Sequence, residues 1–337
     1  MTTDSDVFTP AAALGGSLIW AEEFTAPIAW GARWTGDRSS AYRYCDHNPD
    51  DNKLDWLTPS AVTVSGGVAT FTATPAGRTL ENGRQAWHTG LFTTEYSAEE
   101  FRVRAGDYME TRVRLPCGTG AWPALWTWQD GENEVDCFEY HLDNPHLLEL
   151  SNHVNHASTY RTDVDAIGPD RWVTIGTDLG ATCVEWYVNG DRVFSDGTGV
   201  GLGWSAYPIL NLSLCAGQYH AAPCDPAPIT FDVDYLRVYR WPHPEAVRVP
   251  RSGGRPPELS AGRVSGRRNA PRAVDKVARW PLTQAPLRGR CAGPSAAAGR
   301  SPCCWCSAGR PGCWPPGSSP STSSSCWRTR TSSPAAA

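Results

Sequence analysis

The sequence lacks the markers of a membrane protein. No apolar run approaches the ~18 residues that a helix needs to span a bilayer. The first residues, MTTDSDVFTPAAALGG, show no basic start and no apolar core, so no signal peptide is visible in them. A helical period of normal length is missing as well, and no repeat recurs at a fixed interval. We therefore expect no membrane partner and a non-helical fold, and we treat residues 1–14 as a flexible N-terminus.

The last part of the chain lacks the residues that build a core. From residue 251 onward it holds 13 Arg and one Lys but only two acids, Glu258 and Asp275, and almost no Ile, Phe, Tyr or Met. Such a segment cannot bury enough apolar surface to offset its ordering entropy. Six of the twelve cysteines lie there without a histidine and with poor spacing for a metal site. We interpret residues 243–337 as a low-complexity tail, disordered or translated out of frame. The alternative is a basic tail with a role of its own.

Charge is divided unevenly along the chain. The net charge is −5, and because the tail carries +12, residues 1–250 carry −17. An acidic body repels nucleic acid and sulfated or uronic polymers at long range. We therefore expect a neutral partner and no nucleic acid.

The other six cysteines lie in the acidic body. Their even number permits an oxidising compartment without requiring one. Cys215 and Cys224 are close enough in sequence for a local disulfide within a loop.

Strand signals dominate residues 15–242. Two pairs of alternating apolar and polar segments flank turn dipeptides, Gly66-Gly67 and Asn189-Gly190, which are typical of β-hairpins. Further segments of this kind cover residues 108–115, 209–214 and 229–239. Many short strands at even spacing favour one all-β domain built as a two-sheet sandwich.

One short segment, Glu134-Val-Asp136-Cys-Phe-Glu139, gathers three acids. In a regular strand Glu134 and Asp136 share a face, whereas Glu139, five residues after Glu134, points away. A β-bulge at Cys137-Phe138 returns Glu139 to the same face, and we predict that bulge. The two Glu Cα atoms are then roughly 13 Å apart, from which long side chains can bring their carboxyls to the ~5–5.5 Å of a retaining glycosidase. The alternatives for such a cluster are a solvated strand face or a cation site.

The crowding of these acids suggests separate roles. Three neighbouring carboxyls cannot all ionise freely, so at least one pKa must rise. We assign Glu134 as a nucleophile that is hydrogen-bonded by a protonated or proton-sharing Asp136, and Glu139 as the general acid and then the general base.

Three tryptophans precede the acids: Trp122, Trp126 and Trp128. Indole rings stack on the apolar C–H faces of sugars, so we predict that these residues bind a carbohydrate substrate. Packing in the core is the alternative for each of them.

With these residues in order, the chain resembles glycoside hydrolase family 16, the laminarinase, lichenase, agarase and carrageenase group. The matching segments are LIWAEEF (18–24), GDYMETRVRLP (106–116), GAWPALW (120–126), WYVNG (186–190) and VDYLRVY (233–239). The resemblance implies a concanavalin A-like β-jelly-roll sandwich and hydrolysis with retention, with Glu134 as nucleophile, Asp136 as its assistant and Glu139 as acid/base. The Glu-x-Asp-x-x-Glu spacing is similar to that of laminarinases, agarases and carrageenases. Because the acidic body disfavours a sulfated substrate, we expect an endo-β-1,3-glucanase.

The resemblance also implies a cleft histidine and a structural calcium ion. His153 and His156 have opposite strand parity, so at most one faces the sugar, and we favour His153; a surface imidazole is the alternative. The calcium ligands would be Glu23 and Asp234, whose alternative is a pair of ordinary surface acids. No cofactor is required for catalysis. One departure is Leu91, which stands where the family often has an arginine that contacts sugar.

Two other classes of function remain open at this point. A lectin-like binding module on the same fold typically loses one or both acids, and a structural or adhesion protein would need a tail that assembles. Because all three acids are present, we expect an enzyme that acts on a polysaccharide. We expect it to be a monomer, and the resemblance implies that it is extracellular.

Overall fold

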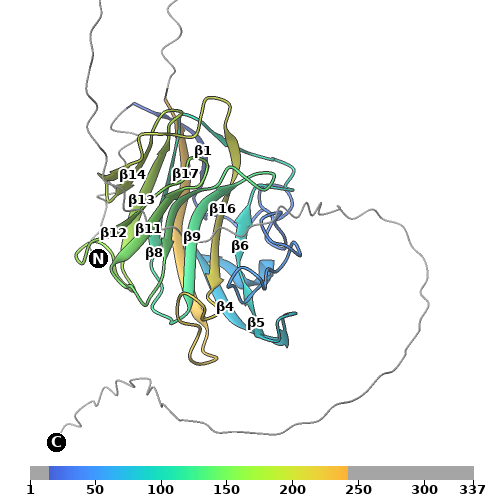
Figure 1. Cartoon of the computed structure of the whole chain (residues 1–337). Helices are drawn as coiled ribbons and strands as arrows, with labels where there is room; N and C mark the ends of the chain where they lie inside the picture. The colour runs from blue at the N-terminus through green and yellow to red at the C-terminus, as the bar shows by residue number, and fades with distance from the viewer. Residues whose placement is uncertain (1–14, 242–337) are drawn as a thin grey trace, which may run out of the picture.

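In a computed structural model of the chain, the described residues, 15–241, form two stacked β-sheets (Figure 1). The first sheet has the order β15 (Asp191–Ser195), β14 (Val184–Val188), β13 (Trp172–Leu179), β8 (Asp107–Arg114), β17 (Ile229–Arg240), β4 (Val68–Thr79), β5 (Gln85–Thr89) and β2 (Asp55–Leu57), with β1 (Ser17–Glu22) beside β17 and β3 (Val62–Ser65) beside β4. The second has the order β12 (Ala157–Thr162), β11 (Leu147–Asn152), β10 (Val135–Tyr140), β9 (Ala121–Trp128), β16 (Ser205–Leu214) and β6 (Leu91–Thr93), with β7 (Val103–Arg104) beside β16.

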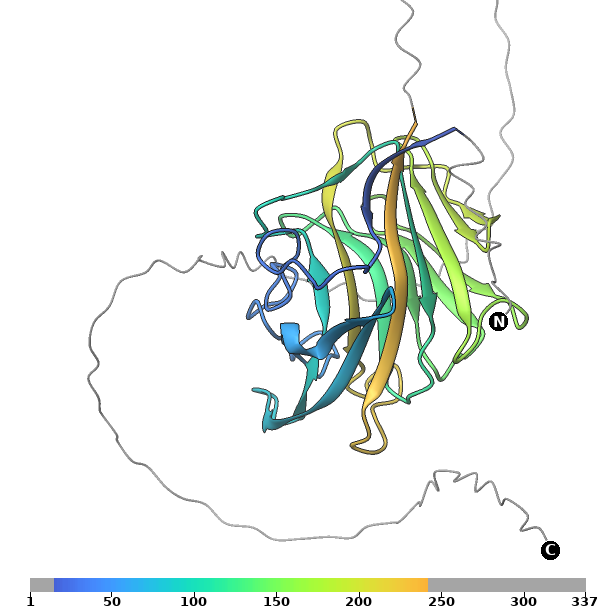
Figure 2. The same ribbon diagram turned by 180° about the vertical axis from the view of Figure 1, so that it is seen from behind.

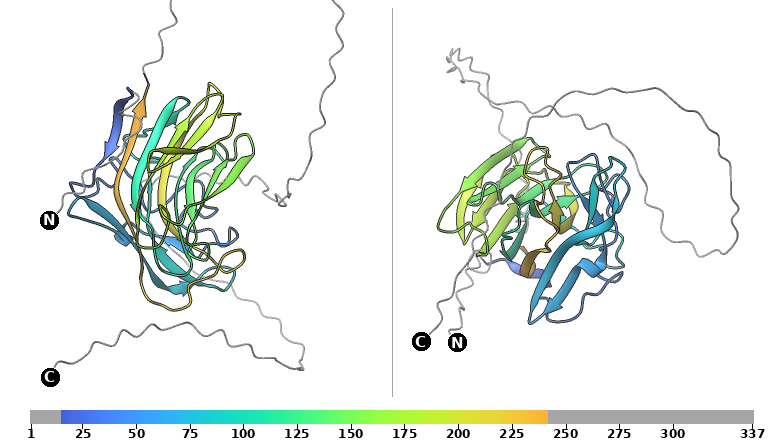
Figure 3. Two further views of the ribbon diagram at one scale, coloured as in Figure 1. Left: turned by 90° about the vertical axis from the view of Figure 1, so that its left-hand side faces the viewer. Right: turned by 90° about the horizontal axis from the view of Figure 1, so that it is seen from below.

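The two sheets lie one behind the other, with the second sheet in front in Figure 1. Seen from behind in Figure 2, β17 of the first sheet comes to the front with β1 alongside it, and Figure 3 gives the side view and the view from below. Apart from the parallel pair β2 and β5, neighbouring strands are antiparallel. The predicted all-β sandwich of the jelly-roll type is confirmed.

Local sequence explains the hairpins. Gly66 and Gly67 have φ of 61° and 82° between β3 and β4, and Asn189 and Gly190 have φ of 49° and 89° between β14 and β15. Positive φ at both turn positions matches the twist of the flanking strands, which is why these dipeptides favour the turn. Both predicted hairpins are confirmed, and within residues 15–241 the only helical element is one 3-10 turn, Pro59–Ala61.

The core lies between the sheets and draws large apolar side chains from both. Phe138 of the second sheet and Trp186 and Phe231 of the first belong to one continuous cluster, and all three are fully buried. This cluster fixes the second sheet from behind and leaves its other face for the acids.

The structure can be compared with several other expectations from the sequence. Cys215 and Cys224 are close in sequence but form no disulfide, because both cysteines are free and Cys215 is buried next to His141. The predictions for residues 1–14 and for the tail lie outside the described residues. Over residues 15–241 there is no helix with the length and apolar character of a membrane span.

Candidate active site

The predicted β-bulge is present in β10. Cys137 and Phe138 are consecutive and both fully buried in the core cluster, so their side chains point to the same side of the sheet. The strand register shifts between Asp136 and Phe138 toward β9, and between Asp136 and Glu139 toward β11. Because a bulge adds one residue to the strand, Asp136 and Glu139 share the face opposite the core.

Trp186 supports the bulge from the opposite sheet. Its indole nitrogen donates a hydrogen bond to the backbone carbonyl of Asp136, with an Nε1–O distance of 2.9 Å. A bulge disturbs the regular ladder, and a buried carbonyl without a partner is costly. The core therefore satisfies the backbone at the point where the acids change register.

Glu134 lies immediately before β10, and hydrogen bonds of the backbone fix its position. The amide of His153 donates to its carbonyl oxygen, with an N–O distance of 3.0 Å. The hydroxyl of Thr127 accepts from the amide of Val135 and donates to the carbonyl of Asn133, both at 2.9 Å. These contacts fix the chain direction on both sides of Glu134.

Asp136 pairs with a histidine. His153 Nε2 donates to Asp136 Oδ2 at 2.9 Å, and this hydrogen bond raises the pKa of His153 to about 9. Asp136, Glu134 and His153 each place one ligand atom within 4.8 Å of the other two. We expected a hydrogen bond between Asp136 and Glu134, but among the described side chains Asp136 instead accepts from a histidine that is protonated at neutral pH.

The surroundings of Glu134 tune its ionisation. Burial raises its pKa to about 7, the Asp136 carboxylate adds to the rise, and the cations of His153 and Lys53 oppose it. This carboxyl therefore exchanges its proton near neutral pH.

The surroundings of Glu139 also favour its protonated form. Burial raises its pKa well above the ordinary value, and the carboxylates of Asp136 and Glu149 raise it further. Trp122 Nε1 donates to Glu139 Oε1 at 2.9 Å, which lowers the pKa in part. The charges around the two carboxyls therefore differ, because the cations of His153 and Lys53 lie near Glu134 and the carboxylate of Glu149 lies near Glu139. A difference of this kind can separate a nucleophile from a general acid.

The other two tryptophans, Trp126 and Trp128, lie beside the acids. Trp126 is buried, 7% exposed, and donates to Asn211 Oδ1 at 2.8 Å. Trp128 is half-buried and donates to Ser40 Oγ at 3.1 Å. Leu91 is fully buried in the same small cluster as Trp126, so this departure from the family is a packing residue.

Sequence reasoning missed two charged residues at this site. Lys53 Nζ lies 4.8 Å from the ring centroid of Trp122 and lowers the pKa of Glu134. Glu149 is the pairing partner of Glu139 on β11. Glu149 interrupts the apolar run Leu147-Leu148-Glu149-Leu150, a signal that could have found it, whereas the position of Lys53 depends on the fold.

The residues predicted to hold calcium do not fit that ion in this arrangement. Both carboxylate oxygens of Glu23 accept from Arg237, at 2.7 and 2.8 Å, and Asp234 accepts from Arg112 at 3.0 Å. Calcium needs six to eight oxygen ligands, whereas each of these acids is neutralised by an arginine. Glu23 and Asp234 therefore each form an ion pair with an arginine.

Paired carboxyls beside tryptophans on one face of a β-sandwich are an arrangement that a glycoside hydrolase can use. Comparison with known proteins points to the same class. A β-glucanase of Rhodothermus marinus is 24% identical over 267 residues, covering 66% of this chain and 85% of that protein. No family model matches the chain.

Solved structures of the same fold are also similar. An endo-β-1,3-glucanase from Pyrococcus furiosus superposes with a TM-score of 0.57 at 20% identity, covering 67% of this chain and 94% of the other. A non-specific endo-β-1,3(4)-glucanase named SCLam, of family GH16, gives a TM-score of 0.53 at 24% identity, over 67% of this chain and 91% of the other. These two structures share the jelly-roll fold of this chain.

Proposed function

We propose that this protein is a retaining endo-glycosidase that hydrolyses a neutral β-glucan, with β-1,3-glucan as its main substrate. The observation that carries the proposal is the bulge at Cys137-Phe138, which places Glu139 on the same face as Asp136. Without it, the two glutamates would point to opposite sides of the sheet.

The mechanism follows from the two protonation states. The carboxylate of Glu134 attacks the anomeric carbon while Glu139 gives its proton to the departing glycosidic oxygen, which breaks the C–O bond and leaves a glycosyl–enzyme ester. Glu139, now a carboxylate, then takes a proton from water, and that water displaces Glu134 with overall retention. The negative charge of Asp136 and the positive charge of His153 offset each other beside the nucleophile.

Charge and the similar proteins support the preference for a β-1,3-glucan. The acidic body disfavours anionic polymers. The similar proteins are named for β-1,3 and mixed β-1,3(4) glucans. Stacking of the sugar on Trp122, next to the general acid, agrees with any neutral β-glucan.

The test is hydrolysis of laminarin, lichenan, agarose, galactan and carrageenan, with the anomeric configuration of the first product followed by NMR. We expect β-configured oligosaccharides from laminarin and no cleavage of carrageenan. Glu134→Gln keeps the size of the side chain and removes its nucleophilic charge, so turnover should be abolished while the circular dichroism spectrum is unchanged. Wild-type turnover in this variant would refute the assignment.

A second variant separates the roles of the two acids. Glu139→Gln removes proton donation, so laminarin cleavage should be lost, whereas an activated aryl glycoside, whose leaving group needs no proton, should still form the glycosyl–enzyme ester. Glu134→Gln should form no ester with either substrate. The opposite result would exchange the two roles.

A further inference from the structure

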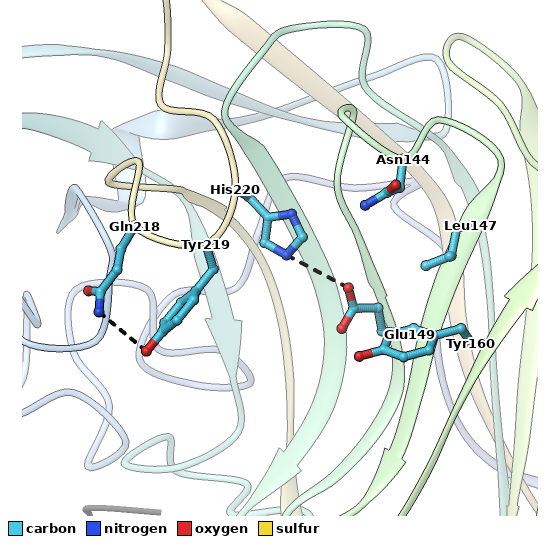
Figure 4. Close-up of a pocket in the computed structure, with 7 residues that line it drawn as sticks. All are labelled: Asn144, Leu147, Glu149, Tyr160, Gln218, Tyr219 and His220. Carbon is cyan, nitrogen blue, oxygen red and sulfur yellow. Dashed lines mark hydrogen bonds and ion pairs between the residues drawn. The ribbon is translucent and has the colours of Figure 1, made fainter. Parts of the chain in front are cut away.

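A second group of ligand-type side chains lies beside the catalytic face. His141 follows β10, Glu149 lies on β11, and His220 lies between β16 and β17; each places one ligand atom within 4.8 Å of the other two. Glu149 and His220 border a hollow of about 460 Å³, together with Asn144 and Tyr160 (Figure 4). The proposed reaction gives His141 and His220 no role.

The spacing between His220 and Glu149 suits an ion better than a direct hydrogen bond. Figure 4 shows the His220 ring turned toward the Glu149 carboxylate, and Nε2 lies 3.7 Å from Oε1. Two ligand atoms that are each ~2.1 Å from a tetrahedral ion lie ~3.4 Å apart. The other ring nitrogen of His220 lies 3.0 Å from Asp143 Oδ1. A carboxylate on the second nitrogen is the usual outer partner of a metal-bound histidine.

His141 brings a third ligand to the same place. Its ring lies face to face with that of His220, with centroids 3.5 Å apart and planes 3° from parallel. Two imidazolium cations repel each other at this distance, so at least one ring is neutral, which is the form that binds a metal. The rings must turn apart to share an ion, and His220 lies in the segment 217–228, which forms no strand.

We propose that His141, Glu149 and His220 form a binding site for a divalent transition metal ion of the Zn²⁺ type. Two imidazoles with one carboxylate suit such an ion, whereas Ca²⁺ and Mg²⁺ prefer an all-oxygen set. The hollow leaves a fourth position open to water.

The position of this site also suggests an effect on catalysis. Glu149 pairs with Glu139 across β11 and β10, so an ion bound there lies next to the general acid. Because an ion at this place would border the proposed general acid, we expect Zn²⁺ to inhibit hydrolysis. This consequence rests on the proposed function, whereas the metal site itself does not.

The site can be tested by calorimetric titration of the full chain with ZnCl₂, after accessible thiols have been blocked with N-ethylmaleimide. We expect the wild type to bind Zn²⁺ and His220→Ala to weaken that binding by more than about 100-fold. Asp143→Asn, which removes only the outer partner, should weaken it about 10-fold. Unchanged melting temperatures in EDTA would show that these variants fold.

His153→Ala is the matched control, because His153 belongs to the other histidine–acid group, with Glu134 and Asp136. We expect this variant to bind Zn²⁺ as the wild type does. If His153→Ala loses the ion while His220→Ala retains it, the ion belongs to the catalytic acids and the proposed site is wrong. Equal binding by wild type and His220→Ala would also overturn it.

The hydrolysis measurement keeps the two proposals apart. We expect Zn²⁺ to inhibit laminarin cleavage by the wild type and to have little effect on His220→Ala. If the wild type binds Zn²⁺ through His220 but cleaves no glucan even in EDTA, the metal site stands and the proposed function fails.

Discussion

The two glutamates that we assign to catalysis differ in their immediate neighbours. Glu134 has two cations nearby, His153 and Lys53, which favour its charged form. Glu139 has Asp136 and Glu149, which favour its protonated form. Burial and Asp136 raise the pKa of both side chains, and the two differ because the cations of His153 and Lys53 oppose the rise at Glu134 whereas Glu149 adds to it at Glu139.

Removal of the cation beside the nucleophile should move the acidic limb of the pH profile. In His153→Ala, the pKa of Glu134 should rise, because one of the groups that lower it is gone. The acidic limb of kcat/KM should therefore shift to higher pH, with a severalfold loss of activity at pH 6. His153→Lys, which keeps a positive charge, should lie closer to the wild type. An equal shift in both variants would show that the charge is not the cause.

The indole of Trp122 should control the other limb. Trp122→Phe removes the N–H donor that lowers the pKa of Glu139, so this pKa should rise. The basic limb of kcat/KM should then move to higher pH, since Glu139 holds its proton longer. A phenyl ring keeps most of the stacking surface, so KM should change less than the pH profile. A change in KM alone would show that Trp122 only stacks on the sugar and does not control the pKa of Glu139.

Among the elements, β10 has the largest influence on function, because its bulge decides which way Glu139 points. The bulge depends on two buried neighbours, Cys137 and Phe138, and on the hydrogen bond from Trp186 to the carbonyl of Asp136. The first sheet thus stabilises the catalytic strand from behind.

Trp186→Phe tests this support. The variant keeps an aromatic ring in the core but leaves the Asp136 carbonyl without its donor, which should cost about 1–3 kcal/mol of unfolding free energy. The kcat should fall as well, because the register of the acids loosens. Trp204→Phe is the matched control, since the buried indole nitrogen of Trp204 has no hydrogen-bond partner. Urea denaturation should show little change for Trp204→Phe, and equal losses in the two variants would contradict the role of Trp186.

For the whole molecule, the acids that we assign to catalysis should lower stability at neutral and basic pH. The pKa of Glu139 is raised in the folded state, so the folded protein binds this proton more tightly than the unfolded chain. Stability from this group is complete below the unfolded pKa and is lost as pH rises toward the folded value. An active site that is costly to the fold is a common trade-off.

Glu139→Gln should therefore stabilise the protein at pH 8, by on the order of 1 kcal/mol or more, and should have no such effect near pH 4. Thermal denaturation across this pH range measures the difference. A gain of equal size at both pH values would mean that packing, and not ionisation, explains it.

Much of the fold was predictable from local sequence. Alternation of apolar and polar residues gave most of the strands, and Gly-Gly and Asn-Gly gave two hairpins, because side-chain direction and positive φ are decided within a few residues. The bulge was predictable as well, since the spacing of Glu134, Asp136 and Glu139 requires one extra residue for a shared face.

The partners of the acids were not predictable in this way. The pairing of Asp136 with His153, of Glu149 with Glu139 and of His141 with His220 depends on which strands and loops become neighbours, which adjacent sequence does not encode. The arginine partners of Glu23 and Asp234 were not predictable for the same reason, because Arg237 and Arg112 reach these acids only across strands. Cys215 is buried and free, although Cys224 lies only a few residues further along the chain. The fold, and not this short separation in sequence, decides whether the two cysteines pair.

The sequence by itself determined the kind of chemistry, because the types and spacing of Glu134, Asp136 and Glu139 are covalent facts of one strand. Only the tertiary structure decided how the pKa of each glutamate shifts, because a pKa depends on burial and on charges brought from distant segments such as Lys53 and Glu149.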